Sequence, residues 1–333
     1  MFKQNNINEL KEYLLKPKKI VVTSHKNPDG DALGSSLAWT KILTKLGHSV
    51  DYISPNGMPE YYSWLPLNKQ MIIYEKSKDY AKNLVYSADI IFSLDYNALD
   101  RMDEFGEVVK ASKAIKIMID HHLFPEDYPT LTYSDTSKSS TGEMIFEMIL
   151  AMGEEDKIDA DIATLLYTAI LTDTGSFAFK CTTQRVHEIV GVLVSKGADP
   201  DTVQNQVYNC FTESRLRFFG FCIMNKMQII PNTNVAYIAV SEKELREFDI
   251  QDGETEGLAN YPLKIANVQA CAFFREKDKQ IRISFRSKGD FDVNILAREH
   301  FNGGGHKNAS GGMMRDSLEN TVKKFENLFL QNG

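Results

Sequence analysis

The chain of 333 residues lacks the long apolar segments that membrane proteins need. Nowhere do about 18 consecutive apolar residues occur, so no segment is expected to span a bilayer. The first residues, MFKQNNINELKEYLLK, predict a polar amphipathic helix and neither a signal peptide nor a membrane anchor. We therefore expect a cytoplasmic protein that has no membrane partner.

Cysteine is also scarce. The four cysteines, Cys181, Cys210, Cys222 and Cys271, form no CxxC pair and lie in apolar stretches. This pattern predicts reduced core thiols and argues against disulfides or a zinc site. Internal repeats, low-complexity tracts and linkers rich in glycine, serine and proline are missing too.

Basic residues are fewer than acidic residues, which gives the chain a net charge of −7. This balance argues against a protein that coats long duplex nucleic acid by neutralising its phosphates. The charge is uneven, however, since Asn260 to Arg315 holds ten lysines and arginines against five acidic residues. An acidic body with a basic C-terminal segment suits a small anionic substrate held against metal-binding carboxylates.

The first half of the chain alternates short apolar runs with helical patterns, which predicts a doubly wound, mostly parallel α/β sheet. The length suits two domains with a cleft between them. Helices are expected from Ser140, where STGE has capping-box spacing, from Asp159 to Thr172, and in TTQRVHEIVGVLVSKG. The predicted strands cover residues 18–25, 48–55, 70–75, 88–96 and 114–122.

The last third of the chain has a different pattern. A long helical stretch is expected through SRLRFFGFCIMNKMQ, followed by strand-like VAYIAVS, VQACAFFRE and QIRISFRS. A glycine-rich stretch and a final helix, LENTVKKFENLFL, complete a smaller α+β domain. We place the domain boundary near residues 190–215.

Residues that can bind metal follow three of the predicted strands. The carboxyl ends of neighbouring parallel strands converge on one crevice, so these side chains should meet there. A helix ending in LTDTGSF can add a further carboxylate beside the sheet, and Gly30 allows a tight turn just after the first strand. The residues concerned are His25, Asp29, Asp31, Asp95, Asp120, His121, His122 and Asp173.

Each of these aspartates, taken alone, is more often an ordinary turn or helix-capping residue than a ligand. The adjacent histidines of IDHH are harder to explain structurally, because charged side chains at a buried strand end need partners. Four such sites together make a structural coincidence improbable.

These motifs carry a family resemblance. HKNPDGDALGSS, SLDYN, IDHH and LTDTGSF, in this order and at roughly this spacing, resemble the four motifs of the DHH phosphoesterase superfamily. FNGGGHKNASGG resembles the glycine-rich signature of the associated DHHA1 domain. Within the superfamily the whole chain is similar to the stand-alone NrnA type. The resemblance implies a DHH catalytic domain at residues 1–200 and a DHHA1 substrate-binding domain at residues 215–333.

The resemblance also implies two metal sites that share one ligand. His25, Asp29 and Asp95 match the ligands of one ion, while Asp31, Asp95, His121 and Asp173 match those of the other. His122 matches the catalytic histidine that faces the scissile phosphate, and Asp120 matches the acid that orients the motif. Because carboxylates dominate and imidazoles are present, two Mn²⁺ ions fit better than Ca²⁺, although zinc or cobalt could also bind in vitro.

The C-terminal domain is expected to select the substrate. Five glycines between Gly303 and Gly312 let backbone N–H groups approach an anion closely. Arg286 can grip a phosphate with two hydrogen bonds, whereas Arg282 is more plausible as a solvated strand-face charge. The substrate-binding candidates are therefore Arg286, Gly304, Gly305, His306 and Lys307.

The leading hypothesis is a phosphoesterase that uses two metal ions to activate water against short oligoribonucleotides and 3′-phosphoadenosine 5′-phosphate. An alternative is a phosphodiesterase for cyclic or linear dinucleotides such as c-di-AMP and pApA. An alternative of another class is a non-catalytic nucleotide-binding sensor. The expected partners are short single-stranded RNA or nucleotides, and a homodimer is compatible with the sequence.

Overall fold

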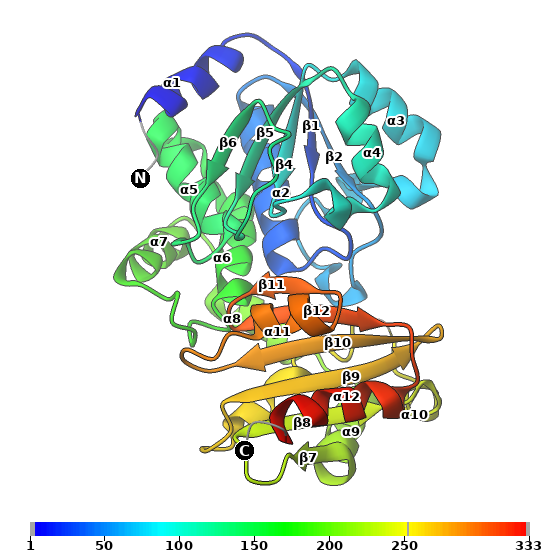
Figure 1. The fold of residues 1–333 in the computed structure, drawn as a ribbon. Helices are drawn as coiled ribbons and strands as arrows, with labels where there is room; N and C mark the ends of the chain where they lie inside the picture. Colours follow the sequence, from blue (N-terminus) through cyan, green and yellow to red (C-terminus); the bar gives the residue numbers. More distant parts are fainter. Residues whose placement is uncertain (1–3, 252, 331–333) are drawn as a thin grey trace. The chain divides into compact units, whose positions relative to one another are not determined.

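The computed structural model describes residues 4–251 and 253–330. The chain divides into two compact units, Met1–Cys210 and Phe211–Gly333, each built on its own six-stranded sheet (Figure 1). The first sheet is parallel and the second is mixed, so the predicted fold class is confirmed.

In the first unit the strands lie side by side in the order β3-β2-β1-β4-β5-β6. The chain moves outward from β1 to β3 and then returns to the other side of β1, so the direction of winding reverses between β1 and β4. Such a switch point leaves a crevice outside the carboxyl ends of the two strands. The strands are β1 Lys19–Thr23, β2 Ser49–Ser54, β3 Ile72–Ile73, β4 Ile90–Leu94, β5 Ile115–Asp120 and β6 Leu131–Ser134.

Two strands differ from expectation. The strand predicted at residues 70–75 is limited to Ile72–Ile73, because a 3₁₀ turn begins at Tyr74. The edge strand β6 was not predicted, since it has four residues and buries only Tyr133 fully.

Both faces of the parallel sheet are covered by helices (Figure 1). Ile20 and Val22 of β1 pack into one hydrophobic cluster, and Val21 packs into the cluster on the opposite face. Alternate residues of a strand point to opposite faces, so a fully buried strand is apolar throughout. The first cluster includes residues of α1 Gln4–Tyr13, α2 Gly30–Lys45, α5 Thr141–Met152, α6 Ala160–Asp173, α7 Gln184–Ser195 and α8 Pro200–Tyr208, and the second includes α3 Lys78–Ser87 and α4 Glu104–Ala111.

The helix starts follow their capping residues. Ser140, Asp159 and Thr183 each accept a hydrogen bond from a backbone N–H in the first turn of the following helix. Residues 1–3 of the helix expected at the start of the chain lie outside the described residues. Within the described part of the chain, every helix is too short or too polar to cross a membrane.

In the second unit the strand order is β11-β12-β10-β9-β8-β7, with β8 and β9 parallel and the other pairs antiparallel. The strands are β7 Met227–Ile229, β8 Val235–Val240, β9 Ala270–Lys277, β10 Gln280–Ser287, β11 Gly304–His306 and β12 Ala309–Met314. The helices are α9 Glu213–Phe221, α10 Glu242–Glu247, α11 Val293–His300 and α12 Leu318–Leu330.

The helix expected through SRLRFFGFCIMNKMQ was predicted too long. Helix α9 ends at Phe221, a π-helical turn covers Cys222–Lys226, and Met227 begins β7. Met227 pairs with Ile238 of β8, so sheet pairing overrides the local helical pattern. All four cysteines are free thiols; Cys222 and Cys271 are buried, and the other two are partly buried.

Candidate metal centre

The first predicted ligands follow β1 at the carboxyl edge of the parallel sheet. His25 lies two residues beyond the strand, and Asp29 caps α2 by accepting hydrogen bonds from the backbone N–H groups of Asp31 and Ala32, both at 3.0 Å. Both hydrogen bonds go to Oδ1, so Oδ2 can still coordinate a metal ion. The capping function and a ligand function are therefore compatible in this residue. Gly30 is needed between the acids, because a Cβ there would lie 2.5 Å from Thr172.

Asp95 directly follows β4 and has the unusual backbone angle φ of 61°. Residues other than glycine rarely adopt this conformation, and such strained positions cluster at functional sites. Its Oδ2 lies 3.4 Å from His25 Nε2, and its Oδ1 lies 3.6 Å from His121 Nε2. The two oxygens of one buried carboxylate thus face two different histidines.

A second group of side chains surrounds His121, the residue after β5. Its Nε2 lies 3.1 Å from Asp173 Oδ2 and 3.7 Å from Asp31 Oδ2. Asp173 is the last residue of α6, and Asp31 lies in the first turn of α2. In both groups, His25–Asp29–Asp95 and Asp31–His121–Asp173, the ligand atoms lie within 4.8 Å of one another.

In both groups a backbone carbonyl determines which nitrogen of the histidine ring carries the proton. His25 Nδ1 lies 2.9 Å from the Lys26 carbonyl oxygen, and His121 Nδ1 lies 3.4 Å from that of Lys138. A carbonyl can only accept, so each Nδ1 must donate its proton. The lone pair of the neutral ring is then on Nε2, facing the carboxylates, as in known metal-binding histidines.

Asp120 and His122 form a separate pair beside these groups. Asp120 Oδ1 lies 2.6 Å from His122 Nδ1, and its Oδ2 accepts the His122 backbone N–H at 3.0 Å. Asp120 is fully buried at the end of β5, so it holds the ring in one orientation. Because Asp120 engages Nδ1, Nε2 is the ring nitrogen with which His122 would meet a ligand.

Charges at this edge of the sheet perturb one another strongly. Burial, reinforced by the charges of Asp95 and Asp173, raises the pKa of Asp31 well above its usual range. Burial opposes the charged form of His121, but its hydrogen bond to Asp173 and the surrounding carboxylates raise its pKa to about 9. Without a metal ion, protons thus offset part of the negative charge, and cation binding would displace them.

Asp95 differs from the other carboxylates. Burial acts to raise its pKa, but the hydrogen bond with His25 and the charges of His122 and His121 lower the pKa overall. Asp95 is therefore ionised between three imidazoles. A permanently charged carboxylate with both oxygens accessible to neighbouring groups is well suited to bridge two cations.

The start of α5 contacts the candidate centre in a way that the sequence analysis missed. The backbone N–H groups of Thr141 and Gly142 donate to the two oxygens of Asp31 at 2.7 and 2.8 Å. The Thr141 hydroxyl donates to Asp95 Oδ1 at 3.0 Å. Gly142 is required, because a Cβ would lie 2.4 Å from Ala169. The STGE pattern indicated the start of this helix, but nothing local indicated which side chains it would meet.

Two predicted substrate-binding residues share one face of the second sheet. Arg286 of β10 and His306 of β11 both pair with Ala309 of β12, and directly paired residues point to the same face. Arg286 Nη1 donates to the Phe285 carbonyl at 2.9 Å. The structure thus brings these two residues together within the second unit.

The glycine-rich stretch forms the β11–β12 hairpin. The Gly305 N–H donates to Asn294 Oδ1 at 3.1 Å, and its φ of 145° favours glycine. Gly304 lies beside it in β11, and Lys307 lies in the turn with Nζ 2.9 Å from Asp290 Oδ1. The N–H of Gly305 is therefore already bonded within the protein, and an anion would have to be held by other groups of the hairpin.

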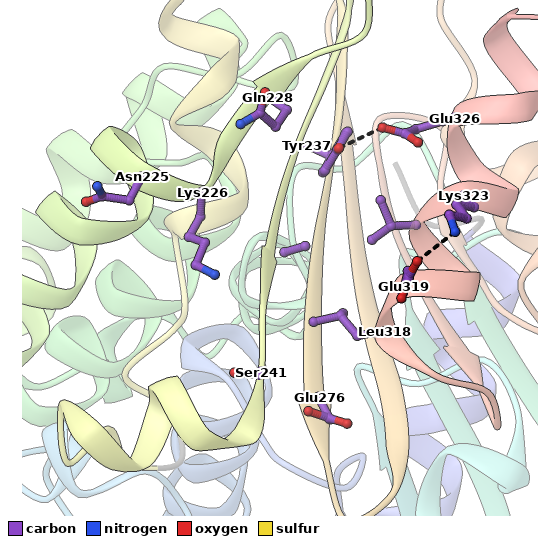
Figure 2. Close-up of a pocket in the computed structure, with 12 residues that line it drawn as sticks. Asn225, Lys226, Gln228, Tyr237, Ser241, Glu276, Leu318, Glu319, Lys323 and Glu326 are labelled. Atoms are coloured by element: carbon purple, nitrogen blue, oxygen red, sulfur yellow. Dashed lines mark hydrogen bonds and ion pairs between the residues drawn. The ribbon is translucent and has the colours of Figure 1, made fainter.

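A shallow groove on the second unit contains none of the predicted site residues (Figure 2). Two polar pairs lie along it. Glu326 accepts from the Tyr237 hydroxyl at 2.7 Å, and Lys323 lies 2.6 Å from Glu319. The groove therefore adds no candidate residue to the site.

Comparison with known proteins identifies the family. The model of the DHH family N-terminal domain matches residues 19–170, and that of the DHHA1 domain matches residues 232–331. The chain belongs to the DHH family. The resemblance inferred from the DHH and GGGH motifs is thereby confirmed.

Individual relatives of this DHH-family chain cover most of its length. The bifunctional oligoribonuclease and PAP phosphatase NrnA of Bacillus subtilis is 32% identical over 88% of this chain and 88% of its own. The crystal structure of an exopolyphosphatase-related protein from Bacteroides fragilis is 42% identical, with a TM-score of 0.94 over 98% of this chain and 95% of that one. RecJ of Thermus thermophilus in complex with Mn²⁺ has a TM-score of 0.55 at 14% identity, covering 98% of this chain and 54% of RecJ, which shows a common fold.

Proposed function

We propose that the chain is a metal-dependent phosphoesterase that hydrolyses short oligoribonucleotides and 3′-phosphoadenosine 5′-phosphate. The observation that carries the proposal is the position of Asp95, whose two carboxylate oxygens face two different histidine–aspartate groups. The name of the Bacillus subtilis relative supports both substrates. The first unit would carry the chemistry, and the second would bind the substrate.

The donor set fits two divalent cations. It combines carboxylate oxygens, which prefer hard ions, with two imidazoles whose Nε2 lone pairs face them, a mixture suited to Mn²⁺. The RecJ structure with Mn²⁺ is consistent with this choice. One ion would be held by His25, Asp29 and Asp95, and the other by Asp31, Asp95, His121 and Asp173.

The chemistry would be divided among these residues. Two bound divalent ions would lower the pKa of a water and stabilise the negative charge on the phosphoryl oxygens. Asp95 orients one oxygen toward each ligand group, and the start of α5 fixes the carboxylate of Asp31. His122 with protons on both ring nitrogens would donate from Nε2 to the phosphate or the leaving oxygen, because the Asp120 carboxylate accepts from its Nδ1.

Substrate selection would be carried by the face of the second sheet that holds Arg286 and His306. A guanidinium on β10 and an imidazole on β11, on either side of β12, supply hydrogen-bond donors for phosphate. Gly304 and Lys307 of the hairpin would contribute next to them, whereas the N–H of Gly305 is already bonded to Asn294. Selection of short substrates follows if these groups bind the parts of the substrate that the metal ligands do not reach.

One assay can compare the proposed substrates with other candidates. The Bacteroides fragilis relative makes inorganic polyphosphate a second candidate, and the dinucleotides c-di-AMP and pApA are further ones. The purified chain should be incubated with Mn²⁺ and a panel of di- to decaribonucleotides, 3′-phosphoadenosine 5′-phosphate, both dinucleotides, pyrophosphate and polyphosphate. We expect turnover of the shortest oligoribonucleotides and the bisphosphate, abolished by a chelator. Tight nucleotide binding without turnover would instead indicate a sensor, and turnover of polyphosphate alone would refute the proposal.

A further inference from the structure

Phe124 is an exposed aromatic residue two positions after His122. Its side chain is 67% exposed, and it belongs to neither of the two hydrophobic clusters that cover the parallel sheet. Its φ of 61° is in the left-handed region, which is unfavourable for a bulky side chain. A strained backbone that presents an exposed aromatic ring two residues from His122 points to function.

The loop that carries Phe124 is held firmly against the loop that carries Asp95. The Asn97 side-chain amide donates to the carbonyls of Leu123 at 2.7 Å and Phe124 at 3.4 Å. In return, the Asn97 carbonyl accepts the N–H of Glu126 at 2.7 Å, and the Glu126 side chain accepts the N–H of Leu99 at 2.9 Å. Bonds on both sides of Phe124 thus fix its backbone.

The position of Phe124 suits a ligand that extends from the metal centre. Two residues of chain keep the Cα atoms of His122 and Phe124 within about 7 Å. A phosphate held at His122 would therefore place the rest of its nucleotide within reach of the ring. The neighbouring Glu126 and Asp127 are acidic and exposed, so they disfavour a second phosphate at this point. A flat, uncharged group remains as the suitable ligand.

We propose that Phe124 is a stacking platform for a nucleobase of the substrate. Every base has a π-face, so stacking on one ring selects nucleotides without selecting a sequence. Because the ring's backbone is fixed in advance, stacking costs little conformational entropy. The inference rests on the proposed function and deepens it, since it makes the base a recognised part of the substrate and disfavours inorganic polyphosphate.

The test compares ligands that differ only in the base. KM is measured for 3′-phosphoadenosine 5′-phosphate and for ribose 3′,5′-bisphosphate, and calorimetry compares AMP with ribose 5-phosphate on the Mn²⁺-loaded protein. Phe124→Ala should weaken binding of the ligands that have a base by roughly five- to a hundredfold. The base-free ligands should be unaffected, and Phe124→Trp should behave like the wild type.

Tyr86→Ala is the matched control. Tyr86 is also an exposed aromatic residue, at 54%, but it lies near the end of α3, before the amino end of β4 and thus at the opposite edge of the sheet from Asp95. Equal effects of Phe124→Ala on both ligands of a pair, or no effect on either, would overturn the inference. Absence of wild-type turnover would refute the proposed function alone, because the AMP comparison still reports on stacking.

Discussion

The two sheets of this protein present their candidate residues in different ways. In the parallel sheet, the candidates come from strand ends and helix ends, and residues as distant in sequence as His25 and Asp173 meet at one edge. In the mixed sheet, β12 runs antiparallel to its neighbours β10 and β11, so the carboxyl ends of adjacent strands do not converge there. There the candidates Arg286 and His306 meet on a face, through their common pairing with Ala309.

The two arrangements also differ in burial. Asp31, Asp95 and His121 are all buried, which strengthens their mutual interactions and shifts the pKa of each. Arg286 and His306 are only partly buried. Under the proposed function, convergence at an edge would concentrate charge for chemistry, and the sheet face would supply donors for recognition. The predictions below test whether the two regions are separable in this way.

The largest effect is expected for Asp95→Asn. The amide has no negative charge to share between the two ligand groups, so both sites should lose affinity and activity should fall to background. Metal analysis and a Mn²⁺-dependent assay measure the two effects. Asp51→Asn, on β2 and outside both groups, should change neither. Two ions still bound per chain in Asp95→Asn would disprove the bridging position.

His122→Ala should separate catalysis from metal binding. The ring is oriented by Asp120 and lies beside the two ligand groups, so ion content should be unchanged while kcat drops about 10²- to 10⁴-fold. His187→Ala, on α7, is the control and should leave kcat as in the wild type. A kcat near the wild-type value in His122→Ala would exclude this catalytic role.

The affinity for Mn²⁺ should depend on pH through His121. Its pKa is raised to about 9 in the metal-free protein, so below that pH a proton occupies the nitrogen that an ion would need. The affinity for Mn²⁺ should therefore increase with pH. As the pH is lowered from 9 to 7, it should decrease by about tenfold per pH unit. Calorimetry in two buffers of different ionisation enthalpy would measure the accompanying proton release. Affinity independent of pH in this interval would contradict the prediction.

Arg286→Ala and His306→Ala should affect recognition only. Loss of one charged hydrogen bond, about 1.5 to 3 kcal/mol, corresponds to a fall in kcat/KM of roughly ten- to a hundredfold for dinucleotides. Ion content should be unchanged, and hydrolysis of a small artificial phosphodiester should fall less than hydrolysis of dinucleotides. Arg282→Ala, an exposed neighbour on the same face of β10, is the matched control. Equal losses on both substrates would show that the second unit supports the fold and does not select the substrate.

The smallest effect is expected for Thr141→Val. This change removes the hydroxyl that donates to Asp95 and keeps the side-chain shape, so Mn²⁺ affinity should weaken by about tenfold. Thr141→Ser should restore it. Thr168→Val, which removes a buried hydroxyl from the middle of α6, should leave the affinity unchanged. If the two valine variants behave alike, Thr141 has no positioning role.

Much of this protein follows from local sequence. Alternating apolar runs and helical patterns are local properties, so the parallel sheet, most of its strands and the caps at Ser140 and Asp159 could be predicted residue by residue. The DHH and GGGH motifs are likewise contiguous, and they identified the family. Local patterns gave the wrong secondary structure where strand pairing determines it. Met227, for example, was expected in a helix but lies in a strand because it pairs with β8.

Tertiary structure alone decided which atoms meet. No spacing in the sequence relates Thr141 to Asp95, 46 positions away, yet the start of α5 bonds both Asp95 and Asp31. Nor does sequence indicate that Phe124 is exposed while its backbone is fixed by Asn97. These relationships depend on how strands and helices far apart in the chain are brought to one edge of a sheet. The sequence determined the types of residue and the elements that carry them, whereas packing of distant segments set their distances, their hydrogen bonds and their pKa values.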